Sequence, residues 1–564
     1  MDTDDKNKNQ QATSEPKVVS MDEIAQVVGN SSQVVPQVPN VNQMPANSSQ
    51  TVVEKAKNMT KRQKAIAVIC MLLVILISIM IYSVFLREPT EEELEAARLK
   101  EEFESYRVSG KTFENFDLYF LKANNNEENQ LYSPLAIKYA LGILSEGAEG
   151  QTKEQIDYII NGYKPKLYES NQHMNFANAM FVKSSHEKDL KNDYKSALKD
   201  KFNTDIVADS FDNSSGINDW ARSNTFDLLD KITTDQKVKN SNYILFNSLA
   251  IDMNWKNLLQ YAEDSLPSKL YDVYLKHENY SDFIEPISDN QYPNIKFEGN
   301  GETQSVSVGA TISNYDIIKD LGEDKIKKTL TEQYQQFLDT GGSCGDIQEI
   351  VNTYYEDLKN NYGVVESSTD FYIYNDDDVA AFAKDLEEVD GIKLQYIAIM
   401  PKKLLLSEYI DESDSKSIQK IITKLKEIKK ENFKSELITK IRVELPLFKY
   451  NYSVDMKSSL NKLKITDVFD KEKANISKMT SKDGSYISDA LHSSGIEFSN
   501  EGLKAAEYSS SKIKKESSCW DYQFQVPVEE IEISFNRPYM YLVRNKDNGE
   551  IWFVGKVHAP TKQE

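Results

Sequence analysis

The longest apolar run in the chain covers residues 65–86, AIAVICMLLVILISIMIYSVFL, and contains no charged residue. About 20 consecutive apolar residues are enough for a helix to cross a bilayer. The chain is basic just before this run and mostly acidic just after it. Because cytoplasmic flanks carry the excess of Lys and Arg, the pattern predicts a single-pass helix in the cell membrane, with residues 1–64 inside and the rest extracellular. The basic residues are Lys55, Lys57, Lys61, Arg62 and Lys64.

A cleaved signal peptide is the alternative interpretation of this run. The apolar core of a signal peptide is usually shorter, begins nearer residue 1 and is followed by small residues at a cleavage site. The run begins here at Ala65, after a long polar segment. These differences favour the membrane helix.

The segments on either side of the apolar run are polar. Residues 1–60 are rich in Asn, Gln, Ser, Val and Pro without a sustained period, so residues 1–64 are predicted to form a disordered tail. After the run, Thr90-Glu-Glu-Glu93 fits a capping box that opens a charged helix ending near Tyr106. This pattern is typical of a solvated helical stalk over residues 87–110.

From Phe113 onwards the pattern is that of a globular domain. The segment 113–123 has apolar residues at helical spacing, and Leu131-Tyr132 is strand-like and precedes Ser133-Pro134 at a helix start. Helical and strand-like segments interleave without a strict βαβ order, which favours an α+β fold. Four later segments rich in β-branched and aromatic residues predict strands: 243–251, 394–401, 441–450 and 531–545.

Charge and composition narrow the classes of function. The net charge of −22 disfavours a nucleic-acid partner, because phosphate binding needs a basic surface. The five His residues are scattered, and the sequence has no CxxC, HExxH, Walker A or GxGxxG motif, so no metal or cofactor is expected.

Of the three cysteines, Cys70 lies in the apolar run, which leaves Cys344 and Cys519 as the two that could pair. Two isolated cysteines are more often unpaired, and free thiols are the favoured prediction.

One catalytic motif needs to be weighed. Gly341-Gly342-Ser343-Cys344-Gly345 fits the GxSxG nucleophile elbow of α/β-hydrolases. That elbow requires a strand before the serine and a helix after it, whereas helical sequence lies on both sides here. A glycine-rich turn between two helices is therefore favoured over an esterase site, and the protein is predicted not to be an enzyme.

Seven segments in chain order resemble the serpin family of serine protease inhibitors. The last of them, FNRPYMYLVRNKDNGEIWFVGKVHAP, follows the terminal hairpin of the family closely, and its Asn-Gly is a strong hairpin-turn signal. The resemblance implies a serpin-like domain over residues 111–562, with three mixed or antiparallel sheets and about eight or nine helices. The seven segments are 131–156, 175–182, 217–225, 243–255, 443–469, 486–506 and 535–560.

The resemblance is lost in the middle of the domain. Residues at about 258–375 match the family poorly, which predicts an insertion there. Two helical-looking pieces lie within it, DKIKKTLTEQYQQFLD and DIQEIVNTYYEDLKNNY. They predict a small accessory subdomain.

The resemblance also implies a reactive loop that a protease cleaves and that then inserts as a strand into the central sheet. Its hinge matches Glu501-Gly502 and continues through Leu503, Lys504, Ala505, Ala506 and Glu507. By the same match, Ser133, Asn247 and His492 lie where the sheet opens, and Trp255 lies near the point where the loop would enter. Ordinary core roles are the alternative interpretation of these four residues.

The loop departs from the inhibitory pattern. Alternate residues of a strand share a face, so Glu507 would face the core together with Leu503, and an unpaired buried carboxylate is costly. Counting forward from Gly502 predicts cleavage at Glu516–Ser517, whereas counting back from Phe535 predicts Pro527, so the loop is about eleven residues longer than usual. The candidate residues of the scissile region are Lys512, Lys514, Lys515, Glu516, Ser517 and Pro527.

These observations predict a cell-surface inhibitor of a serine (or cysteine) protease, monomeric and bound to the membrane through residues 65–86. A non-inhibitory serpin-like binding or scaffold protein is the alternative, and Glu507 and Lys504 favour it. The abundance of Asn, Lys, Asp and Tyr is typical of a low-GC bacterium.

Overall fold

The computed structural model describes residues 60–81, 90–110, 113–256, 294–298, 301–313, 316–361, 371–434, 436–500, 502–503, 519–520, 522, 524 and 527–560. The chain divides into two compact units, residues 1–95 and 96–564. The first unit contains α3 (Lys61–Ile81), and α4 (Glu91–Ser105) begins in it. All other helices and strands belong to the second unit.

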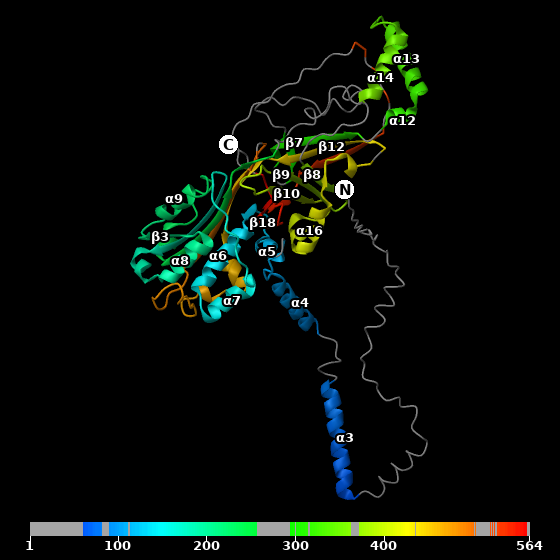
Figure 1. Cartoon of the computed structure of the whole chain (residues 1–564). Helices are drawn as coiled ribbons and strands as arrows, with labels where there is room; N and C mark the ends of the chain where they lie inside the picture. The colour runs from blue at the N-terminus through cyan, green and yellow to red at the C-terminus, as the bar shows by residue number, and fades with distance from the viewer. Residues whose placement is uncertain are drawn as a thin grey trace, which may run out of the picture. The chain divides into compact units, whose positions relative to one another are not determined.

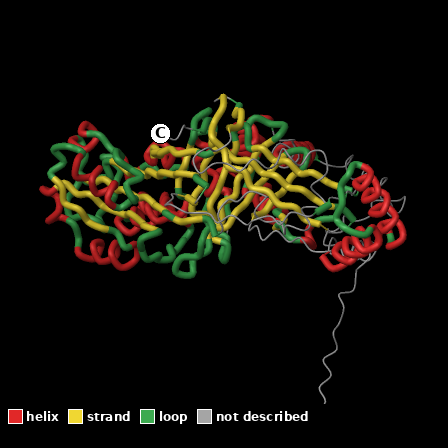
Figure 2. Tube along the Cα trace, turned by 90° about the horizontal axis from the view of Figure 1, so that it is seen from above, coloured by secondary structure: helices red, strands yellow, loops and turns green. Residues whose placement is uncertain are grey.

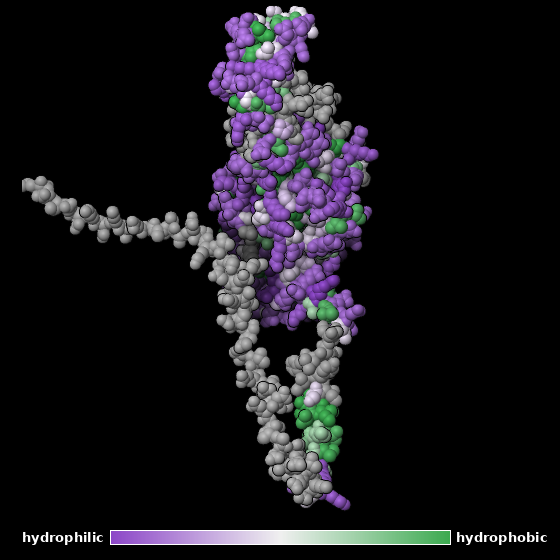
Figure 3. Space-filling view, turned by 90° about the vertical axis from the view of Figure 1, so that its right-hand side faces the viewer, coloured by the Kyte–Doolittle hydropathy of each residue, from purple (hydrophilic) through white to green (hydrophobic). Residues whose placement is uncertain are grey.

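After its polar first turn, helix α3 is apolar on all sides, with large side chains such as Ile66, Met71 and Leu76 exposed. This part of the helix is green in Figure 3. No helix in the described part of the chain is both long and apolar enough to cross a membrane. The predicted span over 65–86 is therefore not found: α3 opens with charged residues, and residues 82–86 lie outside the described residues.

The predicted capping box at the start of α4 is confirmed. The backbone N–H of Thr90 donates to the Glu93 carboxylate at 3.0 Å, and the backbone N–H of Glu93 donates to the Thr90 hydroxyl at 3.3 Å. The two side chains thus satisfy two backbone donors at the helix start, as the Thr-x-x-Glu spacing predicts.

The central sheet of the second unit has the strand order β3-β2-β4-β14-β15-β5, and β13 also pairs with β14. It combines parallel and antiparallel pairs, since β4 runs antiparallel to β2 and parallel to β14. Its strands are β2 (Met174–Lys183), β3 (Asp205–Asp209), β4 (Tyr243–Ile251), β5 (Met253–Asn254), β13 (Phe448–Asp455), β14 (Asp489–Phe498) and β15 (Gly502–Leu503).

A second seven-stranded sheet has the order β1-β18-β17-β10-β9-β8-β11 and packs into the same core as the central sheet. Strand β10 has the bounds that the sequence predicts, and β17 and β18 form the predicted terminal hairpin, with Gly549 at φ 73° in its turn. The strands are β1 (Gln130–Tyr132), β8 (Phe371–Asn375), β9 (Val379–Asp385), β10 (Leu394–Pro401), β11 (Lys426–Glu427), β17 (Tyr539–Asn545) and β18 (Ile551–Val557).

A four-stranded sheet, β16-β12-β7-β6, completes the three (Figure 1). Strands β6, β7 and β8 fall inside the range 258–375, where the sequence predicts an insertion. Strand β12 pairs with β16 in parallel and with β7 in antiparallel orientation. The strands are β6 (Asn294–Phe297), β7 (Gly301–Ser313), β12 (Ile438–Pro446) and β16 (Val528–Ser534).

Helices surround these sheets (Figure 2), and α6 (Pro134–Gly147) is the most deeply buried of them. It begins after Ser133, whose hydroxyl accepts the backbone N–H of Ala136 at 3.0 Å, and it packs against β4 and β18. The other helices of the serpin-like part are α5 (Asn115–Ala123), α7 (Gly150–Ile160), α8 (Asn192–Phe202), α9 (Ser215–Ser223), α10 (Asp235–Lys239), α15 (Leu406–Glu412), α16 (Ser415–Lys424) and α17 (Met456–Lys462).

The predicted accessory subdomain consists of α12 (Ile317–Leu321), α13 (Glu323–Asp339) and α14 (Ile347–Asn361). These helices have an apolar core of their own, separate from the core of the sheets. Ile438, the first residue of β12, belongs to this second core. The subdomain therefore packs against the end of the four-stranded sheet at which β12 begins (Figure 1).

Candidate functional site

The candidate site is a break in the pairing of the central sheet between β4 and β14. These strands pair over only four residues of each, Ile244–Asn247 with Asp489–His492. Just beyond, the hydroxyl of Ser248 donates to the carbonyl oxygen of Ser493 at 2.8 Å. Further along, β4 and β14 are no longer paired with each other, although each keeps its outer neighbour.

The chain itself fills the far end of this break. After β14 it turns back, and Gly502 and Leu503 form the short strand β15 between β14 and β5. Leu503 pairs with Phe498 on one side and with Met253 on the other, and Gly502 pairs with Asn254. Gly502 and Leu503 of the predicted hinge therefore already form a strand of the central sheet.

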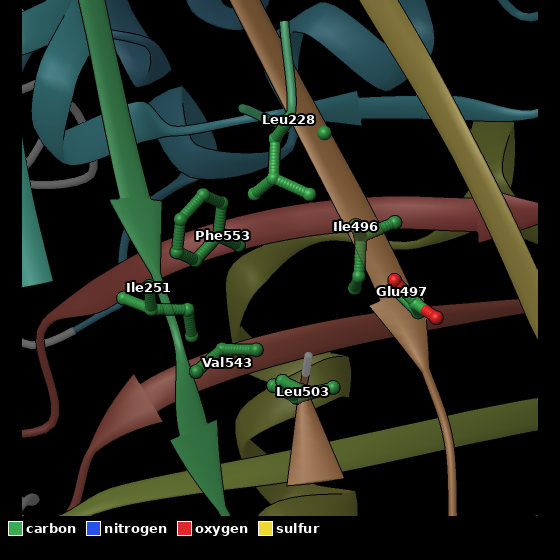
Figure 4. A pocket seen from close by; sticks show the side chains of 8 residues that line it. Leu228, Ile251, Ile496, Glu497, Leu503, Val543 and Phe553 are labelled. Atoms are coloured by element: carbon green, nitrogen blue, oxygen red, sulfur yellow. The ribbon is translucent and has the colours of Figure 1, made fainter. Parts of the chain in front are cut away.

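Between β15 and the last paired residues lies an apolar slot (Figure 4). Leu503 is only 2% exposed and closes one end of it. Val543 and Phe553 belong to the second sheet, which underlies the slot. The remaining lining residues are Leu228, Ile251, Gly495, Ile496 and Glu497.

His492 links three elements where the paired region ends. The backbone N–H of Ser133 donates to its Nε2 at 2.9 Å, so Nε2 is the acceptor nitrogen. Its Nδ1 then carries the proton and donates to the carbonyl oxygen of Asn247 at 3.0 Å. One neutral imidazole thereby joins strand β4, strand β14 and the first turn of α6. Burial lowers the pKa of His492 to about 4.

Trp255 holds the turn through which the chain re-enters the sheet. Its indole N–H donates to the carbonyl oxygen of Ser499 at 3.1 Å, and its ring lies edge-on to Phe498 at 5.5 Å. The Ser499 hydroxyl in turn accepts the backbone N–H of Gly502 at 3.2 Å. The structure thus brings the four predicted sheet-opening residues, Ser133, Asn247, His492 and Trp255, to the two ends of one break.

Gly502 lies where a side chain has no room. A Cβ atom added there would collide with the carbonyl oxygen of Met253 and would lie 2.6 Å from the Cα atom of Asn254. Because real Cβ atoms do not approach a backbone this closely, glycine is required for β15 to pair with β5.

Most of the remaining residues of the predicted loop lie in the part of the chain that the structure does not describe. Glu501, the remaining hinge positions Lys504, Ala505, Ala506 and Glu507, and the scissile candidates Lys512, Lys514, Lys515, Glu516 and Ser517 lie outside the described residues. Pro527 is described and exposed, and its carbonyl oxygen accepts the backbone N–H of Ile438 at 3.0 Å.

The prediction of two unpaired cysteines is wrong, because Cys344 and Cys519 form a disulfide. Their Cα atoms are 5.9 Å apart although 175 positions separate them in the sequence. Spacing in the sequence cannot reveal such a pair, since it depends on how two distant segments meet.

Three aromatic residues after Cys519 also contact the subdomain, and the sequence analysis missed them. Trp520, Tyr522 and Phe524 are all buried in its core. The signal was present in WDYQF, because residues two apart in an extended segment share a face.

The structure rejects the nucleophile elbow at Ser343. Gly341 to Gly345 connect α13 to α14, so a helix precedes the serine where the elbow requires a strand. The hydroxyl of Tyr334 accepts the backbone N–H of Cys344 and donates to the carbonyl oxygen of Gly345, each at 2.9 Å. The turn therefore presents Cys344 for its disulfide.

Comparisons of sequence agree with this architecture. The model of the serpin family, described as serine protease inhibitors, matches residues 115–264 and 366–560. Neuroserpin of Mus musculus is 23% identical over 462 residues, which cover 78% of this chain and 88% of that protein. Serpin B10 of Plecturocebus moloch is 23% identical over 341 residues, which cover 58% and 82%. Both are mammalian proteins, so they do not support the predicted bacterial origin.

Solved structures show the same fold. The thermophilic serpin tengpin in its native state is 20% identical, with a TM-score of 0.52, covering 84% of this chain and 95% of its own. Thyroxine-binding globulin in complex with thyroxine is 16% identical, with a TM-score of 0.52, covering 82% and 100%. The serpin-like α+β fold is thus confirmed.

Proposed function

Since the chain belongs to the serpin family, we propose that it inhibits a serine (or cysteine) protease: the protease cleaves the loop that follows Leu503, and the freed segment inserts into the central sheet between β4 and β14. The single observation that carries the proposal is the position of Leu503, which already forms a strand at the end of the open slot.

The slot offers a physical reason for insertion. A strand placed between β4 and β14 would pair with backbone groups on both sides, as in other cases of strand addition to a sheet. The apolar lining would bury the inward-facing side chains of that strand at the same time. Cleavage supplies the freedom to move, because the loop then has a free end.

Incubation with a panel of serine and cysteine proteases, followed by a denaturing gel, tests the function. An inhibitor of this kind gives a band at the summed mass of protease and protein that survives denaturation. Loop cleavage without such a band, for every protease in the panel, would contradict the proposal.

A second function, binding or scaffolding without inhibition, is favoured by one observation. Leu503 points into the slot (Figure 4) and is buried. Continued strand pairing would turn Ala505 and then Glu507 toward the same face. A carboxylate in an apolar slot costs several kcal/mol unless it finds a partner. Slow or partial insertion would leave the protein a substrate or a binding module.

The proposed location is the outer face of a cell membrane, and it rests on the sequence. The uncharged run 65–86 follows five basic residues, which favours a cytoplasmic N-terminus. The exposed apolar side chains around α3 support the same proposal, because a helix that is apolar on all sides is unfavourable in water.

A further inference from the structure

The subdomain formed by α12, α13 and α14 holds the far end of the loop through two kinds of contact. The first is covalent, between Cys344 in the turn after α13 and Cys519. The second is the aromatic cluster of Trp520, Tyr522 and Phe524 in the subdomain core. Together we call these contacts the loop anchor.

The loop anchor is built around two tyrosines of the subdomain. The ring of Tyr334 lies edge-on to Trp520 at 4.9 Å, while its hydroxyl holds the turn that carries Cys344. Tyr354 lies edge-on to both Trp520 and Tyr522, and its hydroxyl donates to the carbonyl oxygen of Trp520 at 3.1 Å. Side chains, a backbone carbonyl and a disulfide thus fix the same short segment.

The length of strand β12 gives the distance between the loop anchor and the hinge. Its first residue, Ile438, belongs to the anchored core, and its last residue, Pro446, is followed shortly by Phe448. Phe448 pairs with Phe498, which pairs with Leu503. The nine residues of β12 span about 30 Å at ~3.3 Å per residue, so the hinge and the loop anchor are about 30 Å apart.

Chain length then limits what an intact loop can do. Fifteen residues, 504–518, connect Leu503 to Cys519. About nine of them are needed to bridge about 30 Å in extended form, which leaves about six. Because an intact chain that enters the slot must also return, β15 could grow by only about three residues.

Loss of the loop anchor would change this limit. The free segment would then run from residue 504 to residue 527, before β16 begins beside Ile438. About fifteen residues would be spare, enough for β15 to grow by about seven residues without a cut. We propose that the loop anchor keeps the intact loop out of the slot, so that full insertion requires cleavage on the N-terminal side of Cys519.

This inference rests on the proposed insertion mechanism and gives the anchored residues a positioning role in it. It also predicts different consequences for cleavage at the two candidate points. A cut at Pro527 leaves the preceding segment held by the loop anchor, whereas a cut before Cys519 frees the hinge side completely.

Hydrogen exchange tests the inference on the full chain, read at the backbone amides within 248–251 and 493–497 that face the slot and do not pair with β2 or β13. The samples are intact wild type, intact wild type reduced by a dithiol, intact Cys519→Ser/Trp520→Ala, and wild type cut within 504–518 by a lysine-specific protease. The dithiol supplies two electrons and two protons, becomes a disulfide and leaves Cys344 and Cys519 as thiols. Cys70→Ser, kept oxidised and given the same warm incubation as the double variant, is the matched control for loss of a cysteine, because it retains the Cys344–Cys519 disulfide.

Exchange at these amides should be fast in the intact oxidised protein and in Cys70→Ser. It should slow at least tenfold after the cut, and at least threefold in the reduced protein or in the double variant after warm incubation. A protein that is merely destabilised would exchange faster at these amides. If exchange slows only after the cut, or if the amides are fully protected before any treatment, the proposed role of the loop anchor is wrong. If exchange does not slow after the cut, the proposed function is wrong instead.

Discussion

The backbone N–H of Ser133 donates a hydrogen bond of 2.9 Å to Nε2 of His492, and this bond ties the start of α6 to β14. It lies where the pairing between β4 and β14 stops. Opening the sheet any further would pull His492 away from Asn247, its partner on β4. The imidazole therefore resists opening only while it is neutral, because protonated Nε2 cannot accept the Ser133 N–H.

The first prediction concerns pH. The folded-state pKa of His492 is about 4, below its ordinary value of 6.5. The unfolded chain binds the proton more readily, so this contribution to stability is complete above about pH 6.5 and is lost as the pH falls toward 4. We expect a loss of about 2 kcal/mol between pH 7 and pH 5 from this residue.

Urea unfolding of wild type and His492→Gln at pH 7 and pH 5 measures this loss. Glutamine can accept and donate hydrogen bonds but does not titrate, so the variant should lose less stability over this interval. An equal loss in both proteins would show that His492 is not the responsible group.

The sequence predicted strands β4 and β10 correctly, because their apolar runs are bounded by polar residues. It also predicted the helices α13 and α14. It also singled out Ser133, Asn247, His492 and Trp255, which lie at the two ends of the break, but only through resemblance to a family. It could not place β15, because a two-residue strand has no pattern of its own and depends on Met253 and Phe498 beside it. The disulfide could not be chosen over two free thiols for the same reason, since it joins two segments that only the fold brings together.

The second prediction concerns the hydroxyl of Ser248. Ser248→Ala removes the bond to the Ser493 carbonyl oxygen, which bridges β4 and β14 just beyond their last paired residues. We expect a loss of about 1 kcal/mol in stability and faster closure of the slot after loop cleavage, because the sheet opens more easily.

Ser453→Ala is the matched control. Ser453 contacts the hydroxyl of Ser493 from β13, on the other side of β14 from the slot. Hydrogen exchange after cleavage should therefore show faster protection in Ser248→Ala only. Equal rates in the two variants would contradict a specific role for Ser248.

The third prediction concerns the hinge. Gly502→Val places a side chain against the backbone of Met253 and Asn254, so β15 should leave the sheet. Amides of residues 253 and 254 should exchange at least tenfold faster in Gly502→Val, whereas the nearby change Asn500→Ala, in the turn before β15, should leave them unaltered. Unchanged exchange in Gly502→Val would mean that β15 does not pair as described.

The fourth prediction concerns topology. If residues 65–86 hold the protein in a membrane with residues 1–64 inside, protease added to intact cells should remove the large domain and leave the N-terminal segment protected. A tag at residue 1 and an antibody to the domain report the two halves separately. Digestion of the domain only after cell lysis would contradict the proposed location.

Insertion itself is tested most directly by melting curves of the intact protein and of protein cut within 504–518, for wild type and Glu507→Ala. The account predicts a higher melting temperature after the cut, because the freed segment adds a paired strand to the central sheet. The gain should be larger in Glu507→Ala, which removes the carboxylate that would enter the apolar slot. An unchanged melting temperature after the cut in both proteins would contradict insertion and would leave binding without inhibition as the function.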